Sequence, residues 1–334
     1  MKHSRRHFIG TATTCLGAML FHSRFTGINQ AQEVNTNAVK RIVPQLPTPE
    51  KKLRLLIDTD AANEIDDLYA VALALASPER FEIEGFVATH FAAQSNSIDK
   101  SYSQLLELLE AADVTGKYAV KKGSHPMQYA KTPCQSEGVD LIIERALHGD
   151  ADNPLWVVAL GAATNLASAL LIEPSLSEKV RFVFHARSHL TWPQRSTQFN
   201  VQNDILSVRS LLESQVPLVW FDTGTYLTRP MMETAEKIAP SGRLGKYLHE
   251  FRFKKPSFMK EDKGFFDVGD IAWMIQPDLC HSEIVKAPSM HQTMYFDHNK
   301  TNGDMLRVTE IKRDGCWKLF DERLAQYAAQ KKSS

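Results

Sequence analysis

The sequence predicts an α/β fold with a mainly parallel, twisted sheet and helices on both faces. Three short, almost wholly apolar runs carry this prediction: residues 53–57, 155–159 and 217–221. Such runs are typical of parallel strands that are buried on both faces. The first two are each followed by a polar turn and then by a helix-like apolar segment, which is the alternation expected of βαβ units.

The first apolar run leads into an acidic loop, residues 58–67, DTDAANEIDD. The helix that follows, from Leu68 to Ala76, is apolar almost all round, so we expect it to be buried. Asn63 is placed to cap this helix. Open α/β sheets bind ligands at the carboxyl ends of their strands, where this loop places its carboxylates. They are Asp58, Asp60, Glu64, Asp66 and Asp67.

So many carboxylates in one turn repel one another and raise one another's pKa values. A hard cation relieves this repulsion, and Ca²⁺ takes about six to eight oxygen ligands, several of which Asp60 and Asp67 can supply. The alternative is that these acids only cap and solvate a helix start, where negative charge is favoured. The loop is not an EF-hand, since Ala62 and Asn63 stand where that motif needs an oxygen ligand and a glycine.

The N-terminus carries Arg5 and Arg6, followed by a weakly apolar run, GTATTCLGAMLF. This order predicts a Tat-type export signal over residues 1–31, and hence a periplasmic or extracellular protein. A basic arm for nucleic acid is the alternative, but the apolar run argues against it. Residues 32–52, with three prolines, are expected to form an extended leader, and residues 53–334 a single domain.

The composition argues against several classes of partner. The 39 basic and 39 acidic residues balance and form no long basic run, which disfavours nucleic acid and, once the signal is removed, membranes. Of the four cysteines, one lies in the signal, so a disulfide framework is not expected. No cysteine or histidine cluster has zinc spacing. A small molecule is the expected partner, and association of several copies of the chain stays open.

The remaining segments continue the alternation of strands and helices. Strands are predicted over residues 81–90, which brings His90 to the same edge as Asp60, and over 118–120 and 181–185. Helices are predicted over 98–112 and 136–147. Residues 241–264 are expected to be a basic, loop-rich passage, and the tail to form a hairpin around Asn302-Gly303 before a closing helix.

Four segments resemble the nucleoside hydrolases, most closely a divergent exported branch. The acidic loop is similar to the family's Asp-x-Asp-Pro-Gly-x-Asp-Asp signature, with other residues in place of Pro-Gly. Residues 160–167, LGAATNLA, are similar to its Gly-x-x-Thr-Asn-x-Ala segment. Residues 198–200, QFN, are similar to its Glu-Phe-Asn, and residues 265–272, FFDVGDIA, to its C-terminal metal-ligand motif.

The resemblance implies a nucleoside hydrolase-like, Rossmann-related fold with a Ca²⁺ site. It implies that the side chains of Asp60, Asp67 and Asp267 and the backbone carbonyl of Leu160 hold the ion. Asp267 fits the motif better than Asp270, because one acid must lie at the mouth of the helix. Asp66 is expected to be the general base. Substrate contacts are expected from the loops at the same edge: Asn200, Gln198, His90 and Trp192.

The implied function is hydrolysis of the N-glycosidic bond of a ribonucleoside or related N-riboside by a Ca²⁺-activated water. Two departures from the family keep an alternative open. Gln198 replaces the glutamate that binds the sugar in the family. Phe266 stands where base-specific members have a proton-donating histidine. The candidates to replace that donor are His90, His185, His189 and Tyr226. The alternative is a catalytically altered or inactive metal- or glycan-binding protein on the same fold.

Overall fold

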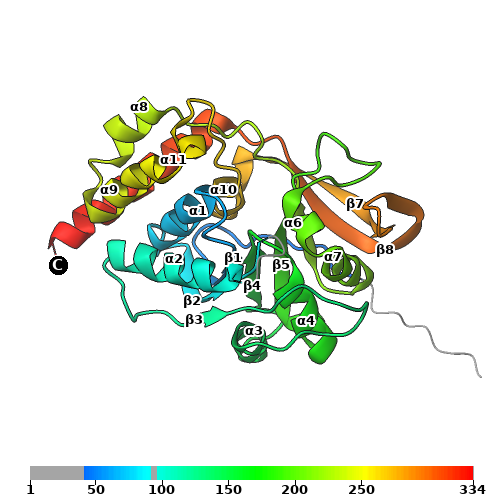
Figure 1. Cartoon of the computed structure of the whole chain (residues 1–334). Helices are drawn as coiled ribbons and strands as arrows, with labels where there is room; N and C mark the ends of the chain where they lie inside the picture. Colours follow the sequence, from blue (N-terminus) through cyan, green and yellow to red (C-terminus); the bar gives the residue numbers. More distant parts are fainter. Residues whose placement is uncertain (1–40, 92–95, 334) are drawn as a thin grey trace, which may run out of the picture. The chain divides into compact units, whose positions relative to one another are not determined.

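One sheet of eight strands, in the order β3-β2-β1-β4-β5-β6-β8-β7, forms the centre of the computed structural model (Figure 1). The structure describes residues 41–91 and 96–333, so the predicted export signal lies outside the described residues. All strand pairs are parallel except the last, β7 with β8, which is antiparallel. The predicted α/β class is therefore confirmed. The strands are β1 (Leu53–Thr59), β2 (Phe81–Ala88), β3 (Val120–Lys122), β4 (Leu155–Ala159), β5 (Val180–His185), β6 (Leu218–Phe221), β7 (His281–Met290) and β8 (Phe296–Thr309).

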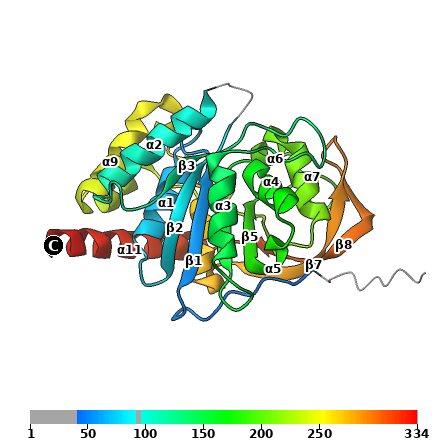
Figure 2. The ribbon, with the colours of Figure 1, turned by 90° about the horizontal axis from the view of Figure 1, so that it is seen from below.

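Helices cover both faces of the sheet. In Figure 1, α10 and α11 lie above the strands and α3 and α4 below them; Figure 2 views the molecule from the side of α3 and α4. The first face carries α1 (Asp66–Leu75), α2 (Ser97–Ala111), α9 (Gly242–Phe251), α10 (Val268–Ile275) and α11 (Arg313–Ser333), and the second α3 (Glu137–Leu147), α4 (Thr164–Ile172), α5 (Leu176–Lys179) and α7 (Ile205–Glu213). The shorter helices are α6 (Phe199–Asn203), α8 (Met231–Glu233), a π-helical turn (Thr234–Ile238) and 3₁₀ turns at Arg252–Lys254, Pro256–Met259 and Pro277–Leu279.

Strand β1 separates two hydrophobic cores. Side chains alternate across a strand, so Leu55 and Ile57 join the core under α1 and α10, whereas Leu56 joins the core under α3 and α4. The helix that follows, α1, is buried along its whole length. This explains the predicted all-round apolar pattern, and it fixes Asp66 and Asp67 at the buried N-terminus of a core helix. No helix within the described ranges is long and apolar enough to cross a bilayer.

Two local predictions at the helices are wrong. Asn63 does not cap α1, whose N-cap is Ile65 without a side-chain hydrogen bond; the Asn63 amide instead donates to Oδ2 of Asp60 at 3.1 Å. The passage over residues 241–264 is not mainly loop, because it begins with helix α9. That helix buries Leu244 and Leu248, spaced one turn apart, in the core it shares with α2 and α11.

The predicted position of the C-terminal hairpin turn is also wrong. Asn302 and Gly303 lie inside β8, and the chain reverses at residues 291–295. Gly303 has a φ of +72° and packs against Arg41. Its left-handed conformation therefore serves a kink in a long strand rather than a two-residue turn. The long hairpin of β7 and β8 extends past the sheet to the loop that follows β5, where Tyr295 pairs with Arg195.

Candidate active site

A cavity of about 240 Å³ lies at the carboxyl ends of β1, β4 and β5. The chain runs outward from β1 to β3 and then returns to place β4 on the other side of β1, and α/β sheets bind ligands at such a switch point. Residues from the loops after these three strands, from α6 and from the start of α10 line the cavity. They are Asp60, Asn63, Glu64, Asp66, Asp67, Leu160, His185, Arg187, Gln198, Phe199, Asn200, Phe266 and Asp267.

Three buried carboxylates converge in this cavity. Oxygens of Asp66, Asp67 and Asp267 lie within 4.8 Å of one another, close enough to share one ion. Burial, followed by the charge of Asp66, raises the pKa of Asp67 to about 7. Burial and the neighbouring acids, Asp67 foremost, also raise the pKa of Asp60 well above its usual range. The described chain supplies no lysine or arginine ion pair to any of these four acids.

The two oxygens of Asp66, a residue that lines the cavity, differ in their partners among the described residues. Its Oδ2 accepts a hydrogen bond of 3.1 Å from the backbone N–H of Phe266, next to Asp267. Its Oδ1 is buried and has no hydrogen-bond partner. A buried, unpartnered carboxylate oxygen is costly unless a ligand or water completes it. The geometry therefore leaves Asp66 one oxygen free to accept a proton.

A backbone oxygen joins the carboxylates. The carbonyl of Leu160 lies at the carboxyl end of β4 and accepts a hydrogen bond of 2.5 Å from the side-chain amide of Asn200. Gly161 follows, and a Cβ there would lie 2.4 Å from Thr89 and 3.1 Å from Asp60. Only glycine therefore lets this turn pass so close to the acidic loop. A carbonyl and several carboxylates are the oxygen donors that a hard cation takes.

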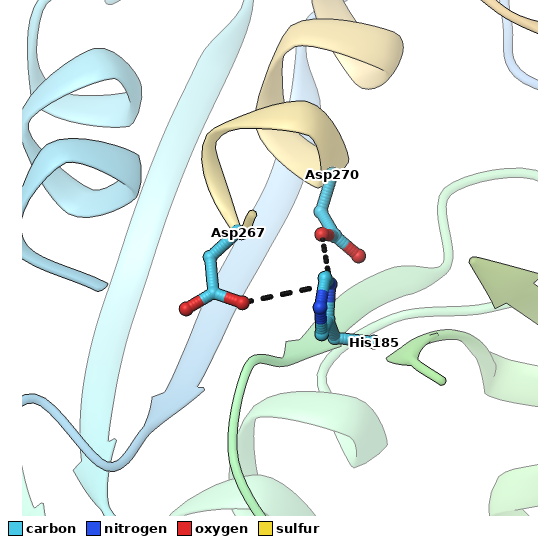
Figure 3. A group of neighbouring side chains, drawn as sticks. All are labelled: His185, Asp267 and Asp270. Carbon is cyan, nitrogen blue, oxygen red and sulfur yellow. Dashed lines mark hydrogen bonds and ion pairs between the residues drawn. The ribbon is translucent and has the colours of Figure 1, made fainter. Parts of the chain in front are cut away.

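His185 lies between two acids at the start of α10 (Figure 3). Its Nδ1 is 2.7 Å from Oδ2 of Asp270 and 3.5 Å from Oδ1 of Asp267. Burial raises the pKa of Asp270, and His185 partly opposes this shift. The second acid of the motif thus holds His185, whereas an oxygen of Asp267 also lies within 4.8 Å of oxygens of Asp66 and Asp67.

The model of the family described as inosine-uridine preferring nucleoside hydrolase matches residues 55–318, which include every segment that lines the cavity. The chain belongs to this family. It is therefore a hydrolase of N-glycosidic bonds, like the enzymes it is similar to.

Two relatives show the extent of the sequence similarity. The chain is 25% identical over 255 residues to the non-specific ribonucleoside hydrolase RihC of Salmonella agona, covering 68% of this chain and 80% of the relative. It is 22% identical over 316 residues to the pyrimidine-specific ribonucleoside hydrolase RihA of Escherichia coli, covering 83% and 99%. The fold is also that of a plant nucleoside hydrolase, PpNRh1, with a TM-score of 0.67 at 16% identity, covering 82% of this chain and 99% of that one.

The loop that carries Gln198 and Asn200 gives this nucleoside hydrolase part of its cavity wall. Oε1 of Gln198 caps α6 by accepting hydrogen bonds from the backbone N–H groups of Asn200, at 2.6 Å, and Val201, at 3.2 Å. The neutral side chain of Gln198 caps the helix, so glutamine in place of the family's glutamate still stabilises the start of α6. Both predicted sugar contacts line the cavity.

Two predicted substrate residues do not line the cavity. His90 is buried, and its Nε2 lies 2.8 Å from the hydroxyl of Thr164. That hydroxyl donates in turn to Asp204, at 2.6 Å, and Asp204 caps α7. His90 therefore connects the Thr-Asn segment to the next helix.

Trp192, the other predicted contact outside the cavity, packs against the β7–β8 hairpin. Its ring centroid lies 5.0 Å from that of Phe296, and the Arg307 guanidinium lies 4.9 Å from it. Both partners belong to β8. Trp192 therefore anchors the loop that carries Gln198 and Asn200, which is a positioning role.

The structure adds cavity residues that the sequence analysis did not place there as site residues. His185, named above only as a candidate proton donor, could have been placed at the cavity from its position, because it is the polar residue that ends the apolar strand β5. Asn63 and Glu64 belong to the acidic loop already singled out. Phe199 belongs to the segment that is similar to Glu-Phe-Asn. Arg187 carries no such signal, since nothing in the spacing of the loop after β5 indicates which side chains turn inward.

Proposed function

We propose that this enzyme hydrolyses ribonucleosides or related N-ribosides with the help of a Ca²⁺ ion held by Asp60, Asp67, Asp267 and the carbonyl oxygen of Leu160. The convergence of oxygens of Asp66, Asp67 and Asp267 within 4.8 Å carries this proposal, and the charge of Asp67 acts on the neighbouring Asp60. Burying several like charges together is costly unless a cation compensates them. When bound, such an ion neutralises the acids and polarises water, which lowers the pKa of that water.

Asp66 is the residue we assign as general base. Its Oδ2 is held by Phe266, so its unpartnered Oδ1 is the oxygen that we assign to accept the proton of the attacking water. The sugar develops positive charge at its anomeric carbon as the N-glycosidic bond breaks. The surrounding carboxylates stabilise that charge because they are already fixed in place.

Gln198 and Asn200 are proposed to hold the sugar. They line the same cavity as the carboxylates, on the wall formed by α6. Gln198 uses Oε1 to cap the helix, so its amide group is the part available to a ribose hydroxyl. The departures at Gln198 and in the acidic loop leave the carboxylate cluster intact, and the noncatalytic alternative is therefore not favoured.

The experiment is the release of free base or reducing sugar from a panel of purine and pyrimidine nucleosides, with Ca²⁺ and with a chelator. We expect release that depends on Ca²⁺ and is lost in Asp67→Asn. A matched control is Asp278→Asn, because Asp278 lies in a short 3₁₀ turn away from the cavity. If no nucleoside is cleaved while calorimetry shows Ca²⁺ bound, the catalytic assignment fails.

We also propose that the chain is exported by the twin-arginine route. The sequence order of Arg5, Arg6 and the apolar run supports this, and these residues lie outside the described part of the structure. Residues 1–40 fused to a reporter should direct export, and Arg5→Lys combined with Arg6→Lys should abolish it. Export that survives the double substitution would contradict the twin-arginine route.

A further inference from the structure

Arg187 is a half-buried arginine on the cavity wall whose donors have no partner within residues 41–91 and 96–333. Its guanidinium lies 3.8 Å from the ring centroid of Phe266, the residue before Asp267. Its Nε is buried without a hydrogen bond, and among the described residues its side chain makes no hydrogen bond or ion pair. The ring fixes the position of the guanidinium but satisfies none of its N–H groups.

The other buried arginines of the described chain behave differently. Each donates hydrogen bonds to backbone carbonyls or carboxylates, as expected of a charged group removed from water. These arginines are Arg41, Arg54, Arg80, Arg229 and Arg252. Arg187 alone among them lines the cavity. Arg209, half-buried like Arg187, also has an unpartnered Nε among the described residues, but it lies away from the carboxylate cavity. The free donors of Arg187 instead line that cavity, and their position there indicates a ligand.

The backbone turns Arg187 toward the cavity. Its φ is +36°, in the left-handed region that few side chains other than glycine, asparagine and aspartate adopt. Its N–H donates to the carbonyl of Phe221 at 3.0 Å, and the next residue, Ser188, donates from its hydroxyl to Asp222 at 3.0 Å. These bonds hold a conformation that would otherwise be unfavourable.

We infer that Arg187 binds the leaving base and stabilises the negative charge that develops on it. This inference rests on the proposed function. As water attacks, its oxygen forms a bond to the anomeric carbon and its proton passes to Asp66. The bond from that carbon to the base nitrogen breaks, and the electron pair goes to the base. The N–H groups of Arg187 donate hydrogen bonds to a carbonyl oxygen or ring nitrogen of the base, which leaves as an anion and is protonated by solvent.

The charges around Arg187 favour a base over a phosphate. Asp66, Asp267 and Glu64 are the carboxylates whose charges act on the guanidinium. A phosphate dianion would be repelled by these acids on entering the cavity, whereas a base is neutral until the bond breaks. Arginine remains protonated in proteins, so Arg187 acts through hydrogen bonds and charge rather than as a general acid.

The test compares Arg187→Met, Arg187→Lys and Arg195→Met. Methionine keeps an unbranched side chain against Phe266 but has no donors, and Arg195 is an exposed arginine of the same loop that faces Tyr295 instead of the cavity. Loss of one such donor group costs about 10²–10³-fold in rate. We expect Arg187→Met to lower kcat/KM by about 10²-fold for uridine and inosine but by less than about tenfold for p-nitrophenyl riboside, whose leaving group is already stable. Arg187→Lys should recover part of the loss, and Arg195→Met should match the parent enzyme.

Binding of the free base gives a readout that does not depend on turnover. Uracil or hypoxanthine should bind the Ca²⁺-loaded Arg187→Met variant at least tenfold more weakly, while ribose binds as before. An equal loss of rate on nucleosides and on the activated riboside, with unchanged base affinity, would overturn the inference. Faster cleavage of uridine 5′-monophosphate than of uridine, lost in Arg187→Met, would also overturn it in favour of a phosphate site. If the parent enzyme cleaves none of these compounds, it is the proposed function that fails.

Discussion

The backbone N–H of Phe266 donates a hydrogen bond of 3.1 Å to Oδ2 of Asp66, which joins the start of α10 to the start of α1. The two acidic motifs of the chain, far apart in sequence, thus meet through a main-chain group. Because the donor is a backbone amide, the side chain at position 266 can vary without loss of this contact. The second oxygen of Asp66 is buried and has no hydrogen-bond partner among the described residues.

This contact allows the proposed role of Asp66 as general base to be tested separately from the proposed role of Asp67 as an ion ligand. In Asp66→Asn the new side-chain oxygen can still accept the bond from Phe266, so the fold and the ion site should be kept while the base is lost. We expect Ca²⁺ affinity close to that of the parent and a rate lower by about 10²–10⁴-fold. Asp67→Asn should instead weaken Ca²⁺ binding, because it removes a ligand. Calorimetric titration and single-turnover kinetics measure the two effects, and an equal loss of Ca²⁺ affinity in both variants would refute the division.

Stabilisation by Ca²⁺ should increase with pH. Burial and mutual repulsion raise the pKa of Asp67 from 3.8 to about 7, and those of Asp60 and Asp267 also rise. A raised pKa in the folded state means that the metal-free protein loses stability as the pH rises from the unfolded value through the folded one. Ca²⁺ removes this penalty once the acids are ionised. The increase in Tm on adding Ca²⁺ should therefore be larger at about pH 8 than at about pH 5, and a larger increase at the lower pH would contradict this account.

Activated substrates should be cleaved much faster than natural nucleosides. Phe266 cannot donate a proton, and no histidine other than His185 lines the cavity within the described residues. Nδ1 of His185 is engaged by Asp270 at 2.7 Å. Missing general-acid catalysis costs about 10²–10⁴-fold on a poor leaving group and little on one that leaves as a stable anion. We predict that p-nitrophenyl riboside is turned over markedly faster than inosine or uridine. Equal rates would show that a proton donor reaches the base, and His185→Gln would then be the first variant to examine.

His90 should make the enzyme sensitive to acid. Burial lowers the pKa of His90 from 6.5 to about 4, although the charge of Asp204 opposes the shift. Below about pH 6.5 the imidazole of His90 binds a proton in the unfolded chain but not in the folded chain, so the folded state loses stability as the pH falls toward 4. His90→Gln should reduce this acid loss by roughly 2–3 kcal/mol near pH 4.5, since each unit of pKa difference is worth about 1.4 kcal/mol. Urea unfolding at pH 7.5 and 4.5 measures it, and the exposed His148→Gln is the control.

The central strands and the acidic loop could be predicted because one physical requirement fixes each. A strand buried on both faces must be apolar, as in Leu55, Leu56 and Ile57, and the acids that follow must lie at its carboxyl end. Asp267 could be preferred over Asp270 for a similar reason, since it precedes the first residue of the apolar helix α10 whereas Asp270 lies within its first turn. These inferences depend on local sequence and on strand direction, and both can be inferred from the amino-acid sequence.

The contacts of His90, Trp192 and Arg187 depend instead on which way a loop turns. All three follow strands that end at the same edge, so topology alone does not distinguish them. Trp192 packs against β8, where its ring contacts that of Phe296. Arg187 lies at the cavity and has a left-handed backbone conformation. Such outcomes are decided by partners distant in sequence. Loop spacing therefore predicted Trp192 and His90 at the cavity, which they do not line, and gave no indication of Arg187, which does line it.

The complete burial of α1 links catalysis to the folding unit of the protein. Asp66 and Asp67 begin a helix whose ten residues are all buried, so neither acid can move away from the cavity unless the core opens. Regions of this kind exchange their amide hydrogens only through global unfolding. In increasing denaturant, activity should consequently disappear together with the whole native structure. Limited proteolysis or mild heat that disturbs only the surface should therefore leave an enzyme that is still active.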